Sequence, residues 1–348
     1  MHWRSGLVSI MIPNFNHSRY LDECIQSALN QTYPDIEIIL LDNQSTDNSL
    51  TIAEKYTDTG LRICRNVFNR RNVSYQILAD SLSSGEFMLL LCADDGIHPD
   101  FCRRAVNIMR RHPNVGYVHG ERDFMLEDGR TVALEPFFHC SFIAPGVNMM
   151  PIYMVTTIAH PTQGIFRRIA FDRIGGYEKE IDHMNADKSL WFYLSSVSDY
   201  AYIRDKMCRI RLASDTQTQL TVRNFQHPVL CHLTINEFVR YAERFGFSKV
   251  LERKEEALKK LAGECLAWCG MCMAAGDHDT ALAYLYYARL LDRGLTSTSK
   301  WLHLMACLDE KRPTSRLDDV WSTDALKKRN YPPPEDFIRI DAATGDVL

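Results

Sequence analysis

Short apolar runs alternate with segments of helical periodicity through the first half of the chain. The apolar runs predict β-strands, and they are Leu7–Pro13, Ile36–Leu41, Leu61–Val67, Phe87–Cys92 and Val115–His119. Apolar residues recur at helical spacing between them, in Tyr20–Asn30, Ser49–Tyr56, Tyr75–Leu82 and Pro99–Arg111. Strands without polar alternation are typical of a sheet that helices cover on both faces. The alternation therefore predicts an α/β fold with a mostly parallel sheet flanked by helices.

The second half of the chain changes to helical patterns alone. Apolar stripes predict helices over His227–Phe245, Ser248–Ala275 and Thr280–Asp292. The segment Gly276–Ala281, followed by Ala288, resembles the second half of a tetratricopeptide repeat, of which one unit is visible. The polar tail with Pro332–Pro334 predicts a loosely packed extension. The expected division is an α/β domain over 1–215, a helical domain over 216–312 and an extended C-terminal tail over 313–348.

Polar side chains follow the first, second and fourth predicted strands at the points where these strands end. They are Asn14–Asn16, Asp42–Asp47 and Asp94–Asp95. The carboxyl ends of parallel strands lie along one edge of a sheet, where open α/β sheets bind ligands. An acidic side chain there can hydrogen-bond a ribose or a base edge, and a pair of carboxylates can hold a divalent cation that bridges phosphates. The pattern therefore favours a nucleotide site.

These strand ends belong to a longer series of motifs. The series is Val8–Asn16, Gln31–Asp35, Glu37–Asp47, Leu91–Asp95, Gly164–Arg168, Phe171–Glu178 and Asn185–Trp191. In this order the motifs resemble those of inverting glycosyltransferases of family 2, from V-S-[IV]-x-[IV]-P-x-[YF]-N at the first strand to a late E-D-x-x-L-W. The resemblance covers roughly residues 7–212. It implies the GT-A fold, a Rossmann-like sheet flanked by helices, and transfer of a sugar from a nucleotide-diphosphate donor.

The resemblance implies roles on the donor side of such a site. Pro13 and Asn16 would shape the nucleotide pocket, and Asp42 would contact the nucleobase. Asp95 would lie near the sugar. Family tendency favours a UDP-sugar, and it leaves guanosine and thymidine donors open. For Asp42 the alternative is a simple helix cap, a common position for aspartate.

The resemblance also implies the chemistry of transfer. Asp94 matches the aspartate that coordinates Mn²⁺ or Mg²⁺, and Asp187 matches the general base. A carboxylate can take the proton of an acceptor hydroxyl as it attacks the anomeric carbon, and a divalent ion offsets the charge that builds on the departing diphosphate. The reaction would be one displacement with inversion. Capping of a following helix is the alternative role for Asp187.

Acceptor-binding residues are expected around the Gly164 motif. His160 and Gln163 precede Gly164 directly, and Trp191 follows Asp187 by four positions. His160 would either steer an acceptor or pack inside the domain, and the sequence favours neither reading. The acceptor itself would be a growing glycan, a lipid-linked sugar or a protein, in the synthesis of cell-surface polysaccharide or glycoconjugate.

The chain departs from the family pattern at several of these positions. Cys92 stands where the D-x-D element begins with aspartate, and a thiol is a poor ligand for Mg²⁺. Ala186 replaces the first acid of the E-D pair. Arg209 and Arg211 stand where the family has R-x-H, and an arginine fork matches the geometry of a diphosphate. A solvated charged face is the alternative for these arginines.

Two other functions remain as alternatives. A nucleotidyltransferase that makes an activated sugar would need a glycine-rich loop with a lysine after the first strand, and Asn14–Arg19 has neither. A catalytically degenerate module that binds a nucleotide sugar or a partner is favoured by Cys92 and Ala186. Turnover by the natural chain would exclude this second alternative.

Composition limits the partners and the compartment. The 348 residues hold 40 Lys and Arg against 44 Asp and Glu, a formal charge of −4, which argues against a general nucleic-acid binder. The 11 cysteines are an odd number and lie mostly in apolar runs, as in a reducing compartment. Residues 1–6 lack the apolar stretch of a signal peptide. The expected location is the cytoplasm. Peripheral contact with the inner face of the membrane and self-association through the helical domain are left open.

Overall fold

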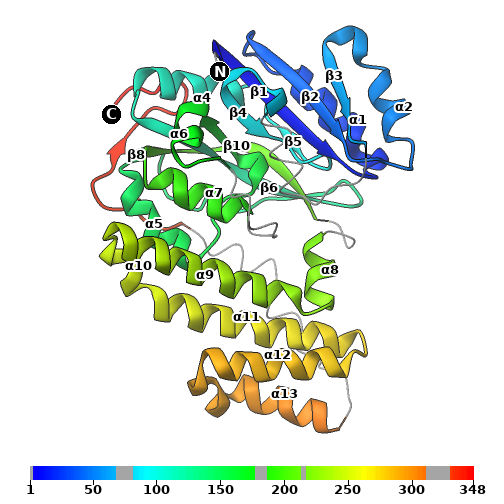
Figure 1. Ribbon diagram of the computed structural model, residues 1–348, viewed down its shortest axis with the longest axis vertical. Helices are drawn as coiled ribbons and strands as arrows, with labels where there is room; N and C mark the ends of the chain where they lie inside the picture. Colours follow the sequence, from blue (N-terminus) through cyan, green and yellow to red (C-terminus); the bar gives the residue numbers. More distant parts are fainter. Residues whose placement is uncertain (1–2, 68–80, 177–185, 213–216, 311–329) are drawn as a thin grey trace. The chain divides into compact units, whose positions relative to one another are not determined.

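The computed structural model describes residues 3–67, 81–176, 186–212, 217–310 and 330–348 (Figure 1). The chain divides into two compact units. The first comprises Met1–Met150, Thr157–Leu212 and Arg329–Leu348, and the second comprises Pro151–Thr156 and Ala213–Lys328. A mixed, mostly parallel sheet with helices forms the first unit, and helices form the second. The predicted fold class is confirmed. The main division after Leu212 lies three residues before the expected boundary at residue 215.

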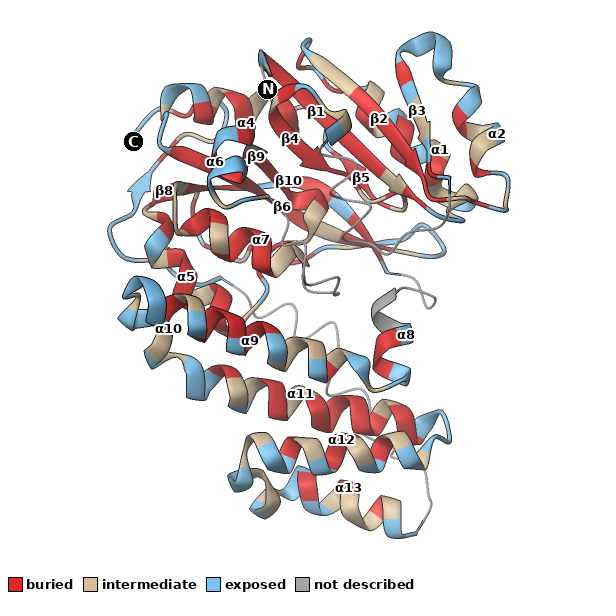
Figure 2. Cartoon of the chain, viewed as in Figure 1, coloured by how far each residue is buried: buried red, intermediate tan, exposed pale blue. Residues whose placement is uncertain are grey.

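The sheet of the first unit has the strand order β11-β8-β10-β6-β9-β4-β1-β2-β3. The bounds are β1 Arg4–Asn14, β2 Ile36–Asp42, β3 Leu61–Arg65, β4 Gly85–Leu90, β6 Val115–Leu126, β8 Phe142–Ala144, β9 Gly164–Arg167, β10 Asp199–Leu212 and β11 Ile338–Arg339. The short strands β5 (Gly96–Ile97) and β7 (Thr131–Val132) pair with β10 and β6. Strand β1 is parallel to both β2 and β4, so the polar residues that follow these strands share one edge. Figure 2 shows β1, β2 and β4 as largely buried.

Helices cover this sheet through their apolar faces. The bounds are α1 Ser18–Leu29, α2 Ser49–Glu54, α4 Phe101–Arg111, α5 Gly146–Val155, α6 Arg168–Arg173 and α7 Ala186–Ser195, with the short 3₁₀ helices η1 Thr57–Thr59 and η2 Pro161–Gln163. The buried residues of α1 are Leu21, Cys24, Ile25 and Ala28, which is the face that the sequence predicts. Most of the helix expected over Tyr75–Leu82 lies outside the described residues.

The second unit is built from antiparallel helices around a core of large side chains. Its helices are α8 Gln217–Arg223, α9 Gln226–Phe245, α10 Ser248–Glu252, α11 Lys254–Ala274, α12 His278–Leu291 and α13 Ser299–Asp309, with η3 Arg293–Ser297. Phe238, Trp268 and Tyr284 are buried in it. The side chain of Asp277 caps α12 by accepting a hydrogen bond from the Thr280 N–H at 3.0 Å. Among the described helices, none combines the length and hydropathy that crossing a membrane requires.

The end of the chain differs from the loosely packed extension expected from its sequence. Strand β11 pairs antiparallel with β8 and covers an edge of the sheet, and unpaired sheet edges are prone to association. Ile340 is 2% exposed, and its N–H donates to the carbonyl of Ser141 at 3.2 Å. The Nε2 atom of His112 lies 2.7 Å from the carbonyl oxygen of Gly345. One buried isoleucine and the backbone pairing explain why a polar segment packs on the first unit.

Replacing Ile340 with alanine should therefore lower the free energy of unfolding by about 2–4 kcal/mol, because a buried side chain would leave a cavity. Ile338→Ala is the matched control, since Ile338 is 46% exposed, and it should cost less than about 0.5 kcal/mol. Urea denaturation of both variants measures the difference. Equal, small losses would mean that this segment does not contribute to the core.

Candidate functional site

The loops after β1 and β2 are joined by buried hydrogen bonds. Asn14 and Asp42 are partners in the strand register, and the Asn14 amide donates to Asp42 Oδ1 at 3.1 Å and to Ser45 Oγ at 2.9 Å. The Ser45 N–H donates to the Asp42 carboxylate at 3.2 Å. The carboxylate of Asp42 is fully buried. These hydrogen bonds of Asp42 therefore serve mainly to fix the shape of the loop after β2.

Asn16 and Pro13 lie beside this buried pair. Asn16 has a φ of 58°, in the left-handed region that asparagine tolerates better than most residues. Its Oδ1 accepts a hydrogen bond from the Thr46 N–H at 2.8 Å, and its own N–H donates to Ser45 Oγ at 3.0 Å. Pro13 is half-buried at the end of β1. Both residues thus shape the loop edge, as the sequence suggests, while contact with a nucleotide stays a prediction.

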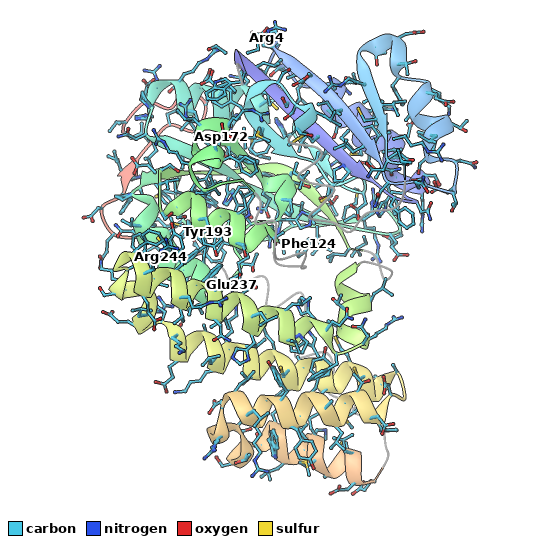
Figure 3. All side chains as sticks on the ribbon, in the orientation of Figure 1. Arg4, Phe124, Asp172, Tyr193, Glu237 and Arg244 are labelled. Atoms are coloured by element: carbon cyan, nitrogen blue, oxygen red, sulfur yellow. The ribbon has the colours of Figure 1, made fainter. Side chains whose placement is uncertain are left out.

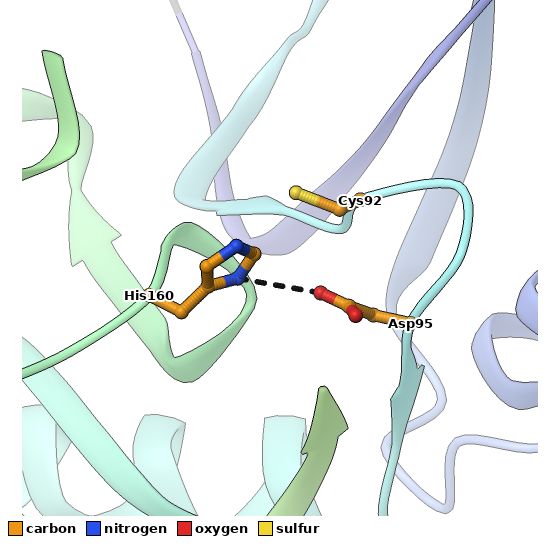
Figure 4. Close-up of side chains that lie close together, drawn as sticks. All are labelled: Cys92, Asp95 and His160. Carbon is orange, nitrogen blue, oxygen red and sulfur yellow. Dashed lines mark ion pairs between the residues drawn. The ribbon is translucent and has the colours of Figure 1, made fainter. Parts of the chain in front are cut away.

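Asp95 follows β4 and is the most tightly held carboxylate of the site. It is 2% exposed. Its Oδ2 accepts from the hydroxyl of Thr162 at 2.6 Å, and its Oδ1 accepts from the Arg211 N–H at 2.9 Å. The Nδ1 atom of His160 lies 3.3 Å from Asp95 Oδ2, as the dashed line in Figure 4 shows. Asp95 therefore connects the end of β4 to η2 and to β10.

Asp94 is half-buried beside Asp95. Burial raises the pKa of the Asp94 carboxyl and the negative charge of Asp95 raises it further, while His17 and His160 act in the opposite direction. Adjacent carboxylates repel each other, and a divalent cation relieves that repulsion. Mg²⁺ typically uses one or two protein carboxylates together with phosphate oxygens. The carboxylates of Asp94 and Asp95 therefore fit the Mn²⁺ or Mg²⁺ ion that the sequence assigns to Asp94.

The expected arginines of β10 share one carboxylate, that of Glu23. The side chain of Arg211 is 4% exposed, and its Nη2 lies 2.9 Å from Glu23 Oε2. Its Nε donates to the backbone carbonyl of Asp94 at 3.0 Å, and its guanidinium stacks 4.0 Å from the ring centre of Tyr20. Arg209 is half exposed, with its Nη2 3.4 Å from Glu23 Oε1. Arg211 thus supports the Asp94 loop, while Arg209 is the more accessible cation.

His160 and Asp187 are coupled through their charges. Burial disfavours the charged imidazole, but Asp95, Asp187 and Asp94 outweigh it and raise the pKa of His160. Burial also raises the pKa of Asp187, and the nearby positive charge of His160 counteracts part of that rise. One imidazolium therefore balances several carboxylates that come from two separate segments of the first unit.

Gln163 lies in the interior and holds η2 in place. It is 2% exposed. Its amide donates to the carbonyl of Gly120 at 3.0 Å, and its Oε1 accepts from the Arg122 guanidinium at 2.6 Å and from the His160 N–H at 2.9 Å. The guanidinium of Arg122 also lies 5.4 Å from the ring centre of Phe124, which Figure 3 labels on β6. Gln163 therefore fixes the backbone of His160.

Gly164 and Trp191 are packed against each other. A Cβ atom added at Gly164 would lie 2.2 Å from the indole of Trp191 and 3.0 Å from the ring of His119. Trp191 is 1% exposed and stacks on Tyr117, with ring centres 5.9 Å apart. These contacts give both residues a packing role, and contact with an acceptor stays a prediction. Because Trp191 and Asp187 lie four residues apart on α7, this packing also orients Asp187.

Several residues that complete the site were missed from the sequence. Thr162, Glu23, Tyr20 and Arg65 each contact a predicted residue, and the Arg65 Nε lies 3.5 Å from Asp42 Oδ2. Thr162 stands inside the His160–Gln163 segment, so its position was the one available signal. Tyr20 and Glu23 lie on α1 and Arg65 lies on β3, and their spacing in the sequence matches no binding or catalytic motif.

The mostly parallel sheet with helices, and acidic loops at the carboxyl ends of its strands, define an α/β domain with a GT-A-like fold. Solved structures share this architecture. The TM-score is 0.54 with TarS 1–349 of S. aureus in complex with UDP-GlcNAc, at 18% identity, over 88% of this chain and 92% of that one. It is 0.51 with the mannosyltransferase PcManGT of Pyrobaculum calidifontis in complex with GDP-Man and Mn²⁺, at 17% identity, over 90% and 87%. At these identities the likeness shows the fold alone.

Residues 9–175 match the family model described as glycosyl transferase family 2. An uncharacterized glycosyltransferase of Rickettsia typhi is 28% identical over 63% of this chain and 68% of its own length. The hyaluronan synthase of Pasteurella multocida is 26% identical over 73% of this chain, which spans 27% of that larger protein. Residues 9–175 therefore form a domain of glycosyltransferase family 2, a family of nucleotide-sugar glycosyltransferases.

The packing of Gly164 against Trp191 can be tested by adding one methyl group. Gly164→Ala should lower the free energy of unfolding by about 1–3 kcal/mol, because an overpacked core must shift. Gly96→Ala is the control, since its added Cβ would meet atoms only at 3.8 Å and beyond. Thermal unfolding of both variants provides the comparison. A Gly164→Ala variant as stable as the natural chain would show that the indole does not press on this position.

Proposed function

We propose that the chain transfers one hexose-type sugar from a nucleoside-diphosphate donor, with a UDP-sugar favoured, to an acceptor hydroxyl with inversion. The observation that carries this proposal is the contact of Asp95 with His160 at 3.3 Å, with Asp187 and Asp94 acting electrostatically on the same imidazole. The TarS complex with UDP-GlcNAc supports a UDP-sugar, and the PcManGT complex leaves GDP-sugars as the second donor class. The likeness to a hyaluronan synthase supports a role in polysaccharide or glycoconjugate synthesis.

The donor would lie along the edge where β1, β2 and β4 end. The loops of Asn14–Asn16 and Asp42–Thr46 are prearranged by their mutual hydrogen bonds, which lowers the entropy cost of binding a base and ribose. Arg209 is an exposed cation of β10 beside Glu23 and would meet the diphosphate. Glu23 is the partner of Arg209 in the free chain. When the donor binds, its diphosphate would take the place of the Glu23 carboxylate.

Asp94 would hold Mn²⁺ or Mg²⁺ together with oxygens of the diphosphate. When bound, such an ion supplies Lewis-acid stabilisation of the negative charge on the leaving diphosphate. The protein contributes the position of Asp94, because Arg211 fixes its backbone carbonyl. Asp95 makes its hydrogen bonds within the protein, so it would orient this loop from the interior.

Asp187 would remove the proton from the acceptor hydroxyl as its oxygen attacks the anomeric carbon. Its pKa is raised by burial, and a base whose pKa approaches the working pH takes a proton more readily. The nearby charge of His160 limits this rise and so favours the ionised, proton-accepting form of Asp187. His160 would also fit an acceptor hydroxyl, since 37% of its side chain is exposed.

Removing the charge of Asp187 tests the base. Asp187→Asn should lower kcat by at least about 10²-fold, the low end of what general-base catalysis contributes, while nucleotide affinity stays unchanged. Release of UDP or GDP from a panel of nucleotide sugars, with water and free sugars as acceptors, measures the rate. Asp172→Asn on the exposed surface of α6, labelled in Figure 3, is the control. An undiminished rate in Asp187→Asn would exclude this base.

The donor class and the ion can be tested together by thermal shift. UDP, GDP, dTDP and CMP are each added with and without Mn²⁺ to the natural chain and to Asp94→Asn. A nucleotide at 100 times its Kd stabilises by about 2.7 kcal/mol, which corresponds to a rise of several degrees in Tm. We expect one nucleotide to give a Mn²⁺-dependent rise that Asp94→Asn loses. Binding without any turnover would favour the degenerate nucleotide-sugar-binding module, and no rise with any nucleotide would contradict both functions.

A further inference from the structure

Three different donor atoms meet beside Asp94. Cys92 offers a sulfur, Asp95 a carboxylate oxygen and His160 an imidazole nitrogen, and these atoms lie within 4.8 Å of one another. Figure 4 shows the thiol of Cys92 and the carboxylate of Asp95 on the same side of the His160 ring. Within the part of the chain that the structure describes, no other group of at least three such side chains is this close.

The spacing of these atoms is near that of a tetrahedral zinc site. Zn–N and Zn–O bonds of about 2.0–2.1 Å and Zn–S bonds of about 2.3 Å place neighbouring ligand atoms about 3.3–3.6 Å apart. The His160 Nδ1 to Asp95 Oδ2 distance is 3.3 Å. The ligand atoms lie within 4.8 Å of one another, so the thiol needs to approach by about 1.2 Å at most to reach that spacing.

The chemistry of this donor set differs from that of the ion at Asp94. Thiolate and imidazole ligands select zinc and similar ions of intermediate softness, whereas Mg²⁺ and Mn²⁺ favour oxygen. The position that makes the difference is Cys92, because an aspartate there would leave mainly oxygen ligands. Coordination favours the thiolate and releases the thiol proton to solvent, so the neutral state of Cys92 in the free chain is no obstacle.

Neighbouring groups already orient the three side chains. The Thr162 hydroxyl donates to Asp95 and accepts from the Cys92 N–H at 3.2 Å, so a single fully buried side chain fixes both residues. Gln163 fixes the His160 backbone. Such supporting hydrogen bonds are typical of metal sites and strengthen binding. Asp94 and Asp187 act electrostatically on His160, and they would equally attract a cation held there.

We propose that Cys92, Asp95 and His160 bind a zinc-class divalent cation with a fourth position left for water or a phosphate oxygen. The binding itself stands on these three side chains alone. A further consequence rests on the proposed function: a cation held here lies beside Asp94 and removes the imidazolium from among the carboxylates. It should therefore compete with the Mn²⁺-dependent binding of the donor.

Cobalt is a spectroscopic probe for this site. The full chain is freed of metal with a chelator and titrated with Co²⁺. We expect one Co²⁺ per chain, a near-ultraviolet charge-transfer band from the thiolate, and displacement of that band by Zn²⁺. Cys92→Ser should lose the band, and His160→Ala should weaken Co²⁺ binding at least tenfold. Wild-type binding without a thiolate band, or a full band in Cys92→Ser, would overturn the proposal.

Control variants separate this site from other thiols and from the donor site. Cys64→Ser should keep the band, since Cys64 lies on β3 outside the cluster. Cys92→Asp tests the same position with a carboxylate and should gain Mn²⁺ affinity while it loses the band, provided that its unfolding transition matches the natural chain. Asp94→Asn should keep the cobalt band even where it loses the Mn²⁺-dependent nucleotide response. A band that disappears in Asp94→Asn would contradict a site made by Cys92, Asp95 and His160.

Discussion

The buried carboxylate of Asp95 is the constraint on which the site depends. An ionised group that leaves water costs several kcal/mol unless partners replace its hydration. Asp95 receives the Thr162 hydroxyl, the Arg211 N–H and the nearby imidazole of His160. These partners come from η2 and β10, far from Asp95 in the sequence. The need to satisfy one carboxylate therefore brings the end of β4 together with the elements that hold His160 and Arg211.

The remaining charges follow from that arrangement. The backbone N–H of Arg211 donates to Asp95, its Nε donates to the carbonyl of Asp94, and its Nη2 pairs with Glu23, so one residue connects these three acids. Burial and the negative charge of Asp95 raise the pKa of Asp94. Burial also raises the pKa of Asp187. Carboxyl groups with raised pKa values around one histidine are typical of functional sites. The free chain tolerates their repulsion, and a cation or a proton in transit would relieve it.

Local patterns determined which parts were predictable. The strands around Ile10 and Leu89, the helical face of Leu21, and the polar strand ends at Asp42 and Asp94 are encoded within a few residues each. The contacts of Asp95 join positions 95, 162 and 211, and no local period relates them. The family motifs place Gly164 and Trp191 on the acceptor side, whereas no local pattern indicates their mutual packing, which joins positions 164 and 191. Likewise, no local pattern distinguishes the buried Ile340 from the exposed Ile338, and Ile340 packs because β11 pairs with the edge strand β8.

Cys92 changes the electrostatics of the site as much as its ligand chemistry. Burial raises the pKa of its thiol, and the charges of Asp95 and Asp94 raise it further, so the side chain is neutral. A carboxylate at this position would add one more negative charge next to Asp94, where two carboxylates already repel. The thiol therefore weakens the attraction for a hard cation at Asp94 and leaves His160 with fewer anionic neighbours to balance. The same substitution supplies the one ligand atom that a softer cation requires, so a single sulfur shifts the site's preference among metals in both directions.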